Sequence, residues 1–272
     1  MIMSRGIGKI RRFFLRDFII ARSYRIMFVF ELAETLFGVA AFYYLSRFIE
    51  VPSFTNTQAV GGYFAFAVVG FAFFDYLSVS LNAFDLSLEE ARRNGTLEYL
   101  LVTRTSLVTI LVGSAVYPFV LLSLRTTVYL GWAVLLFKFP VSQANWAGAI
   151  LILSASVLAF TGLGVLSAGY AILFKRGNPV KWFFLGGAGL VSGVMYPVSV
   201  LPPALQFVAR LVPVTYSLEG MRLALLQDTS IVDLWPDLRA LLLFAVVLLP
   251  ISLAVFSWAL RRTKITGTLT HF

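Results

Sequence analysis

Residues 107–174 contain only two charged side chains, Arg125 and Lys138. An apolar helix of about 20 residues crosses the hydrocarbon core of a bilayer, so this stretch is long enough to cross more than once. The chain of 272 residues is 13% charged and 59% hydrophobic, whereas roughly a quarter of the residues in a soluble domain are charged. The composition therefore indicates a membrane protein.

Lipid offers no hydrogen-bond partner to the backbone, so membrane spans are helices or closed barrels. The runs at 107–124 and 240–260 are continuously apolar and do not alternate as barrel strands do. We therefore expect an all-α polytopic membrane protein with six transmembrane helices. The expected spans are residues 27–49, 60–82, 107–136, 146–173, 182–199 and 239–260.

Residues 1–26 have the pattern of an amphipathic helix that lies on the inner membrane surface, ahead of a transmembrane domain at 27–272. A cleaved signal peptide is the alternative, but Glu31 and Glu34 interrupt the apolar run that follows. The two faces of the helix are Arg5, Lys9, Arg12 and Arg16 on one side, and Ile7, Ile10, Phe14 and Phe18 on the other.

Positive charge is concentrated at the chain ends and in the connections at 83–106 and 174–181. These segments hold sixteen of the 22 Lys and Arg residues. Because cytoplasmic loops are enriched in these residues, we expect both termini to be cytoplasmic. The net charge of +9 follows from this distribution, and without a soluble basic domain it does not indicate a nucleic-acid partner.

Two connections are more than simple loops. Residues 83–106 are predicted to form two short helices broken at Asn94-Gly95, the second with a stripe of leucines. This connector is either a solvated amphipathic link or a docking element for a partner. Residues 197–236 are mostly apolar but are interrupted by Pro197, Pro202, Pro203 and Pro213, so we expect a re-entrant helical hairpin in the outer leaflet.

These two segments resemble the ABC-2 type transporter permeases. The first resemblance lies in Glu89–Ser106, with Gly95-Thr96-Leu97-Glu98 followed by Leu100-Leu101-Val102-Thr103. Arg104 departs from the family pattern, in which Pro commonly follows the Thr. The second resemblance is Ser192-Gly193 with Tyr196-Pro197, Leu201-Pro202, Pro213-Val214-Thr215-Tyr216 and Arg222.

The resemblance implies a subunit of an exporter in a bacterial or archaeal cell membrane. Its partners would be two copies of an ATP-binding cassette ATPase, a second copy of itself or a paralogous permease, and membrane lipid. The residues expected to couple to the ATPase are Glu89, Glu90, Arg92, Arg93, Gly95, Thr96, Leu97, Glu98 and Leu100. The hairpin residues that carry the resemblance or lie beside it are Pro197, Pro202, Pro213, Tyr216, Glu219 and Arg222.

The chain itself is not expected to be an enzyme. It has no phosphate-binding loop of the G-x-x-x-x-G-K-[ST] type, so ATP and Mg²⁺ would be bound by the partner ATPase and no cofactor by this chain. Cys is absent and the single His271 lies beside the C-terminus, so neither a metal site nor a catalytic constellation is predicted.

Four charged residues fall within the expected spans: Glu31, Glu34, Asp75 and Arg125. Such residues are costly in lipid and should face protein or water. The three acids are predicted to form salt bridges with Arg22 and Arg25 at the inner rim, or else to line a cation pathway. Arg125 is predicted to pair with Glu219 of the hairpin, or else to contact an anionic substrate.

The second expected span is rich in aromatic residues. They serve either in packing or as a pathway along which sugar or lipid groups stack, and the pathway candidates are Tyr63, Phe66, Phe73 and Phe74. The fifth expected span contains Gly186, Gly187, Gly189 and Gly193, which suit close helix contact.

We expect an exporter that moves an amphipathic substrate outward: a drug, a lipid or a lipid-linked glycan. An exporter of a long polysaccharide, such as O-antigen or teichoic acid, is the alternative. A second alternative is a secondary transporter coupled to an ion gradient, in which the intramembrane acids relay protons or cations. The acids cluster at one rim and the two halves show no evident repeat, which disfavours this class.

Overall fold

The computed structural model describes residues 2–23, 25–48, 62–93, 107–141, 144–174, 178–227 and 229–265. Every regular element within these ranges is helical, as predicted. The long helices are α1 (Ile2–Ser23), α2 (Arg25–Phe48), α4 (Gly62–Arg93), α6 (Leu107–Phe137), α7 (Trp146–Phe174) and α12 (Trp235–Ile265). The short ones are α8 (Pro179–Lys181), η1 (Trp182–Gly187), α9 (Ala188–Val191), η2 (Val198–Val200), α10 (Pro203–Arg210) and α11 (Pro213–Leu226).

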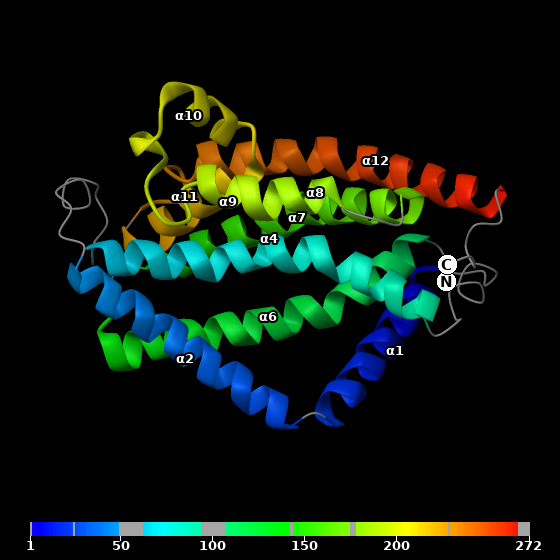
Figure 1. The fold of residues 1–272 in the computed structure, drawn as a ribbon, viewed down its shortest axis with the longest axis horizontal. Helices are drawn as coiled ribbons and strands as arrows, with labels where there is room; N and C mark the ends of the chain where they lie inside the picture. Colours follow the sequence, from blue (N-terminus) through cyan, green and yellow to red (C-terminus); the bar gives the residue numbers. More distant parts are fainter. Residues whose placement is uncertain are drawn as a thin grey trace.

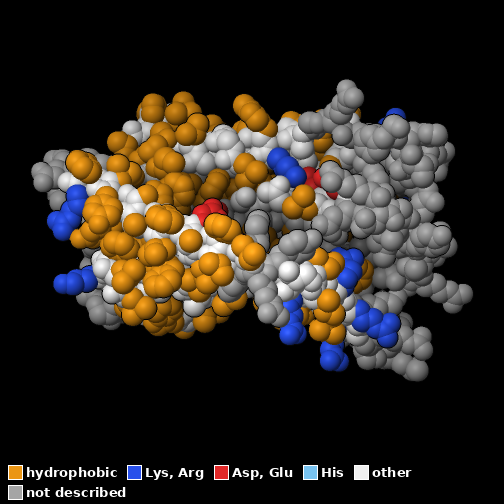
Figure 2. Space-filling view, turned by 60° about the horizontal axis from the view of Figure 1, so that its bottom comes forward, with side chains coloured by type: hydrophobic (Ala, Val, Ile, Leu, Met, Phe, Trp, Pro, Cys, Tyr) orange, Lys and Arg blue, Asp and Glu red, His pale blue; other side chains and the backbone are white. Residues whose placement is uncertain are grey.

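Five of the described helices are long and apolar enough to cross a membrane: α2, α4, α6, α7 and α12. In Figure 1, α4, α6, α7 and α12 run along the long axis of the molecule, and α1 slants across one end. Figure 2 shows a broad hydrophobic surface with Lys and Arg side chains gathered mostly toward its two ends. This distribution is the one that a bilayer requires of a polytopic protein.

The fifth expected span, at 182–199, is wrong in its bounds. Consecutive helical segments α8, η1 and α9 cover only residues 179–191 and then end. At 1.5 Å per residue this length is about 20 Å, which is less than the roughly 30 Å of the hydrocarbon core. The helix ends because Gly193 adopts a left-handed conformation with φ +82°, and because Pro197 follows shortly after.

The prediction for residues 83–106 is wrong in its first half, because residues 83–93 do not form a separate short helix. They continue α4, which runs from Gly62 to Arg93 without a break. No Gly or Pro interrupts this part of the sequence, and buried Phe84 anchors it against the neighbouring helices. With 32 residues α4 is about 48 Å long, so it extends well beyond the hydrocarbon core. The second half of the connector, residues 94–106, lies outside the described residues.

The core of the protein is built around α4 and α7. In the membrane-spanning part of α4, 72% of the residues are buried, and in α7 the share is 56%, compared with 11% in α2. α4 packs against α2, α6, α7 and α11, while α12 packs along α7. α4 is therefore enclosed by other helices, whereas α2 is peripheral.

Glycines allow α7 to approach both of its neighbours closely. A Cβ at Gly164 would collide with the carbonyl oxygen of Ser80 and the ring of Phe84, both on α4. A Cβ at Gly162 would lie only 2.8 Å from the Cβ of Leu248 on α12. Small residues have the same role at many helix contacts in membranes, because they let the two backbones come together.

We predict that Gly164→Ala destabilises the protein by about 1–3 kcal/mol or more, since the added methyl group would force α4 and α7 apart. Gly131→Ala is the matched control, because open space surrounds Gly131 on α6. Thermal unfolding of the two purified variants in detergent measures the difference. Equal melting temperatures for both variants would contradict the close packing of α4 on α7.

Candidate functional site

The residues expected to couple to an ATPase are partly described by the structure. Glu89 lies on the last turns of α4 with its side chain exposed, and Glu90, Arg92 and Arg93 belong to the same helix. The remaining five, Gly95, Thr96, Leu97, Glu98 and Leu100, lie outside the described residues. The first residues of the expected connector therefore continue α4, the most enclosed of the described membrane-spanning helices.

A buried polar cluster joins this end of α4 to the start of the next segments. The Nζ atom of Lys181 lies 2.7 Å from Oδ2 of Asp85, whose side chain is only 10% exposed. Nδ2 of Asn178 donates to the same oxygen at 3.2 Å and to Oγ of Ser167 on α7 at 2.8 Å. Asn178 also caps α8, because its side-chain oxygen accepts the backbone N–H of Lys181. The cluster therefore ties α4, α7 and α8 together.

A second buried contact ties α4 to the hairpin at the opposite end. Arg222 on α11 donates from Nε and Nη2 to the carbonyl oxygen of Phe66 on α4, at 3.3 and 3.2 Å. Its Nη2 also donates to the carbonyl oxygen of Val194 at 3.0 Å, and the guanidinium lies 3.4 Å from the centre of the Phe66 ring. Gly70 leaves the space for this approach, because a Cβ there would collide with Arg222 and with the Val194 carbonyl.

The prolines of the hairpin segment begin its short helices. Pro197 and Pro202 are extended residues directly before η2 and α10, and Pro213 is the first residue of α11. The hydroxyl of Tyr216 donates to the carbonyl oxygen of Arg210 at 3.0 Å, which fixes α11 to the end of α10. Most of α11 is buried, and it packs against α4, α7 and α12. Glu219 lies one turn before Arg222 and supplies opposite charge to it.

The intramembrane charges do not pair as expected. Nη2 of Arg125 on α6 lies 3.4 Å from Oε1 of Glu34 on α2. The carboxylate of Asp75 on α4 interacts electrostatically with both residues. These three residues therefore form one group where α2, α4 and α6 meet.

Two predictions about these charges are therefore wrong. Arg125 does not pair with Glu219, because α6 packs against α1, α2 and α4, whereas α11 packs against α4, α7 and α12. Glu34 meets Arg125 instead of the arginines at the inner rim. Glu31 lies close enough to Tyr117 on α6 for its carboxylate to act electrostatically on the Tyr117 hydroxyl. Sequence position gives the depth of a residue, but it does not give the direction in which the residue faces.

The aromatic residues of α4 are engaged in packing. Phe66 and Phe73 are 5% exposed, and Phe73 stacks on Tyr76 with ring centres 5.9 Å apart. Phe74 packs against Gly189 of α9, and Tyr63 is partly buried. Within the described chain, these contacts favour packing over a stacking pathway. Gly189 makes a close contact, while Gly186 is surrounded by open space.

Sequence reasoning missed the residues that join the elements: Gly70, Asp85, Ser167, Asn178 and Lys181. The sequence places Asp85 in the first of the two short helices expected for the cytoplasmic connector, and Lys181 enters only as a cytoplasmic cation. The dipeptide Asn178-Pro179 was the available signal, because Asn followed by Pro is typical of the start of a helix.

Comparison with known proteins identifies relatives of the chain. It matches the sequence profile of the ABC-2 type transporter family over residues 10–226. It is also 30% identical over 90 residues to the inner membrane transport permease YadH of Escherichia coli K12, and equally to its counterparts in Escherichia coli O157:H7 and Shigella flexneri. That alignment covers 33% of this chain and spans only about a third, 35%, of the length of each relative.

We predict that Glu34 and Arg125 are energetically coupled. In a double-mutant cycle of Glu34→Gln and Arg125→Gln, unfolding in detergent should give a coupling free energy on the order of 0.5–2 kcal/mol. The same cycle between Arg125 and Glu219 is the control and should give none. Coupling to Glu219 but not to Glu34 would contradict the arrangement of α2 and α6.

We also predict that Lys181→Met is strongly destabilising, by about 3–5 kcal/mol, because it leaves the Asp85 carboxylate buried without its cation. Adding Asp85→Asn should restore most of the lost stability, since Asn is neutral and can still accept from Asn178. Thermal unfolding of the single and double variants measures both effects. A double variant that is less stable than Lys181→Met alone would show that Asp85 and Lys181 are not a pair.

Proposed function

This chain belongs to the ABC-2 type transporter family, and we propose that it is the permease of an ATP-driven exporter. In this proposal two such membrane subunits, identical or paralogous, assemble with two ATP-binding cassette ATPases. The permease is a multi-pass protein of the cell membrane, with both of its termini in the cytoplasm.

The observation that carries this proposal is the unbroken helix α4. It is enclosed in the membrane, extends beyond the hydrocarbon core, and leads directly into the segment whose sequence resembles the coupling motif of the family. A stiff helix moves as one body, so a displacement of its protruding end is transmitted into the membrane. A soluble ATPase that binds residues 94–106 would act on this end.

The two buried contacts of α4 give that motion a route to neighbouring elements. At the end of α4 near Arg93, Asp85 is bonded to Lys181 at the start of the short fifth segment. At the other end, the Phe66 carbonyl is bonded to Arg222 of the hairpin. We infer that α4, the fifth segment and the hairpin shift together during the transport cycle.

The energy source is assigned to the partner. The sequence of this chain contains no phosphate-binding loop, so ATP and Mg²⁺ are bound by the ATPase subunits. The permease contributes the membrane pathway and receives the motion. In this division of roles the chain is not itself a catalyst.

The proposed substrate is amphipathic, such as a drug, a lipid or a lipid-linked glycan, and it is moved outward. This assignment rests on the resemblance of the connector to that of family members with such substrates. Export of a long polysaccharide is the alternative within the same mechanism. An ion-coupled secondary transporter is disfavoured, because Glu34 is already paired with Arg125 and Asp75 interacts with the same arginine.

The connector provides the test of this proposal. Leu97→Asp together with Leu100→Asp should abolish co-purification of the ATPase, because a helix face that binds an apolar groove would become charged. The permease itself should remain inserted and dimeric. Glu98→Lys, a milder change next to Leu97 in the sequence, should retain the ATPase but reduce the transport obtained per ATP hydrolysed.

The measurements are pull-down of the ATPase with the tagged permease and ATP hydrolysis in proteoliposomes. Arg261→Glu on the exposed end of α12 is the control for a charge change outside the connector. An Asp variant that keeps its ATPase and its substrate-stimulated hydrolysis would refute the role of the connector.

A further inference from the structure

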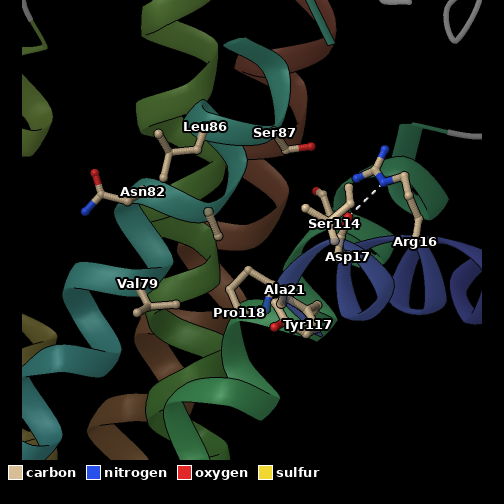
Figure 3. Close-up of a pocket in the computed structure, with 12 residues that line it drawn as sticks. Arg16, Asp17, Ala21, Val79, Asn82, Leu86, Ser87, Ser114, Tyr117 and Pro118 are labelled. Carbon is tan, nitrogen blue, oxygen red and sulfur yellow. Dashed lines mark hydrogen bonds and ion pairs between the residues drawn. The ribbon is translucent and has the colours of Figure 1, made fainter. Parts of the chain in front are cut away.

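A cavity of about 320 Å³ lies where α1 crosses α4 and α6. Figure 3 shows its lining, with Arg16 and Asp17 from α1, Asn82 and Leu86 from α4, and Pro118 from α6. Its volume is at the lower end of the roughly 300–1,000 Å³ that is typical of small-molecule sites. The cavity lies apart from the Asp85, Arg125 and Arg222 contacts described above, because it is lined by none of those residues.

With the start of α4 placed at one edge of the hydrocarbon core, the cavity lies near the opposite edge. Asn82 and Leu86 are 20 and 24 residues from the start of α4, or about 30–36 Å along its axis. This distance equals or slightly exceeds the thickness of the core, so the cavity lies at the boundary between acyl chains and headgroups. α1, which forms one wall, has the composition of a helix that lies in this boundary.

The cavity is open to its surroundings. Ile20 on α1 and Leu86 on α4 both line it, and both are 55% exposed. Two apolar side chains that are half exposed at this depth meet lipid and not water. A molecule in the adjoining leaflet can therefore enter the cavity without crossing the protein.

The lining combines apolar walls with polar side chains, among them Arg16, Asp17 and Asn82. Val79, Ala83 and Pro118 form the apolar walls. Because Pro118 has no N–H, the backbone carbonyl of Ser114 at the wall lacks the donor that it would have in a regular helix. The guanidinium of Arg16 lies at the rim with its side chain 49% exposed. Its Nε donates to Asp17 at 2.7 Å and forms an ion pair with it. Among the described residues the two Nη groups have no hydrogen-bond partner, so their donors can serve a ligand.

The charge around the rim selects among amphipathic ligands. The described side chains of α1 include the exposed Arg11, Arg12, Arg16 and Arg22, against the single acid Asp17. An ammonium headgroup would be repelled by this surface, whereas a phosphate would be attracted and could accept two N–H bonds from Arg16.

We propose that this cavity binds one acyl chain of an anionic phospholipid from the leaflet on which α1 lies, with the lipid phosphate on Arg16. The chain fills the space between Val79, Ala83 and Pro118. The bound lipid holds α1 against α4 and α6, next to the turn of α4 that leads to Glu89. This inference does not depend on the nature of the transported substrate or on the partner ATPase.

The absence of Cys from the chain makes a direct test possible. A fluorophore is attached to Ala21→Cys at the cavity, and in a separate variant to Val246→Cys, which is 69% exposed on α12. Each labelled protein is reconstituted into vesicles of phosphatidylcholine with increasing phosphatidylglycerol. Quenching is compared between preparations in which one lipid or the other carries brominated acyl chains.

Brominated phosphatidylglycerol should quench the fluorophore at Ala21→Cys more strongly than its share of the bilayer lipid explains. Quenching of the fluorophore at Val246→Cys should instead be proportional to that share. Arg16→Ala should lower the apparent affinity at Ala21→Cys by about tenfold or more, as expected for loss of a charge-assisted hydrogen bond to the phosphate. Arg12→Ala, an exposed arginine of α1 that does not line the cavity, should change it by less than about twofold because it lacks the direct phosphate contact.

A second variant tests the cavity without touching its charge. Ala83→Trp fills the space and should reduce quenching at Ala21→Cys by brominated chains of either lipid, with no change at Val246→Cys. Three outcomes would overturn the proposal. They are equal effects of Arg16→Ala and Arg12→Ala, equal quenching by the two lipids at Ala21→Cys, and quenching that Ala83→Trp leaves unchanged.

Discussion

The enclosure of α4 by other helices is the constraint on which the rest of the structure depends. In lipid there is no hydrophobic force that drives two apolar helices together, so close packing and buried polar contacts decide the arrangement. α4 uses both. Its backbone approaches α7 at Gly164 and α11 at Gly70, and its two ends are bonded to Lys181 and Arg222. The peripheral helices α2 and α12 are arranged around this assembly.

Three charged contacts within the described chain join different elements. Glu34 and Arg125 join α2 to α6, Asp85 and Lys181 join α4 to α8, and Arg222 joins α11 to the backbone of α4. A single unpaired charge in lipid costs several kcal/mol, so each partner holds the other in place. The contacts of α4 are the ones that link the connector end to the hairpin end. For this reason we assign the transmission of motion to α4.

The sequence predicted those parts of the fold that depend on interactions within one helix and with the lipid around it. Long apolar runs placed α6 and α7 within about one residue of their observed bounds, because a helix that crosses lipid must be continuous. The fifth span was placed wrongly because average hydropathy does not register the left-handed turn at Gly193. The partner of Arg125 was wrong because depth along a helix says nothing about which neighbour the side chain faces. Asp85 was missed because residues 83–93 were expected to form a separate cytoplasmic helix, whereas α4 continues through them and keeps Asp85 packed against its neighbours.

The central claim, that α4 and the hairpin of α10 and α11 move as one body, can be tested by distance measurements between spin labels. Labels at Glu89→Cys on α4 and Phe207→Cys on α10 report on the two ends of this body, and both positions are exposed. In proteoliposomes that contain the ATPase, the account predicts one narrow distance distribution that is the same with and without bound nucleotide. In the same conditions, the distance between the Glu89 positions of two copies should change, which confirms that the cycle proceeds. A distance between Glu89 and Phe207 that shifts or broadens on nucleotide binding would show that the hairpin moves independently of α4, and would contradict the account.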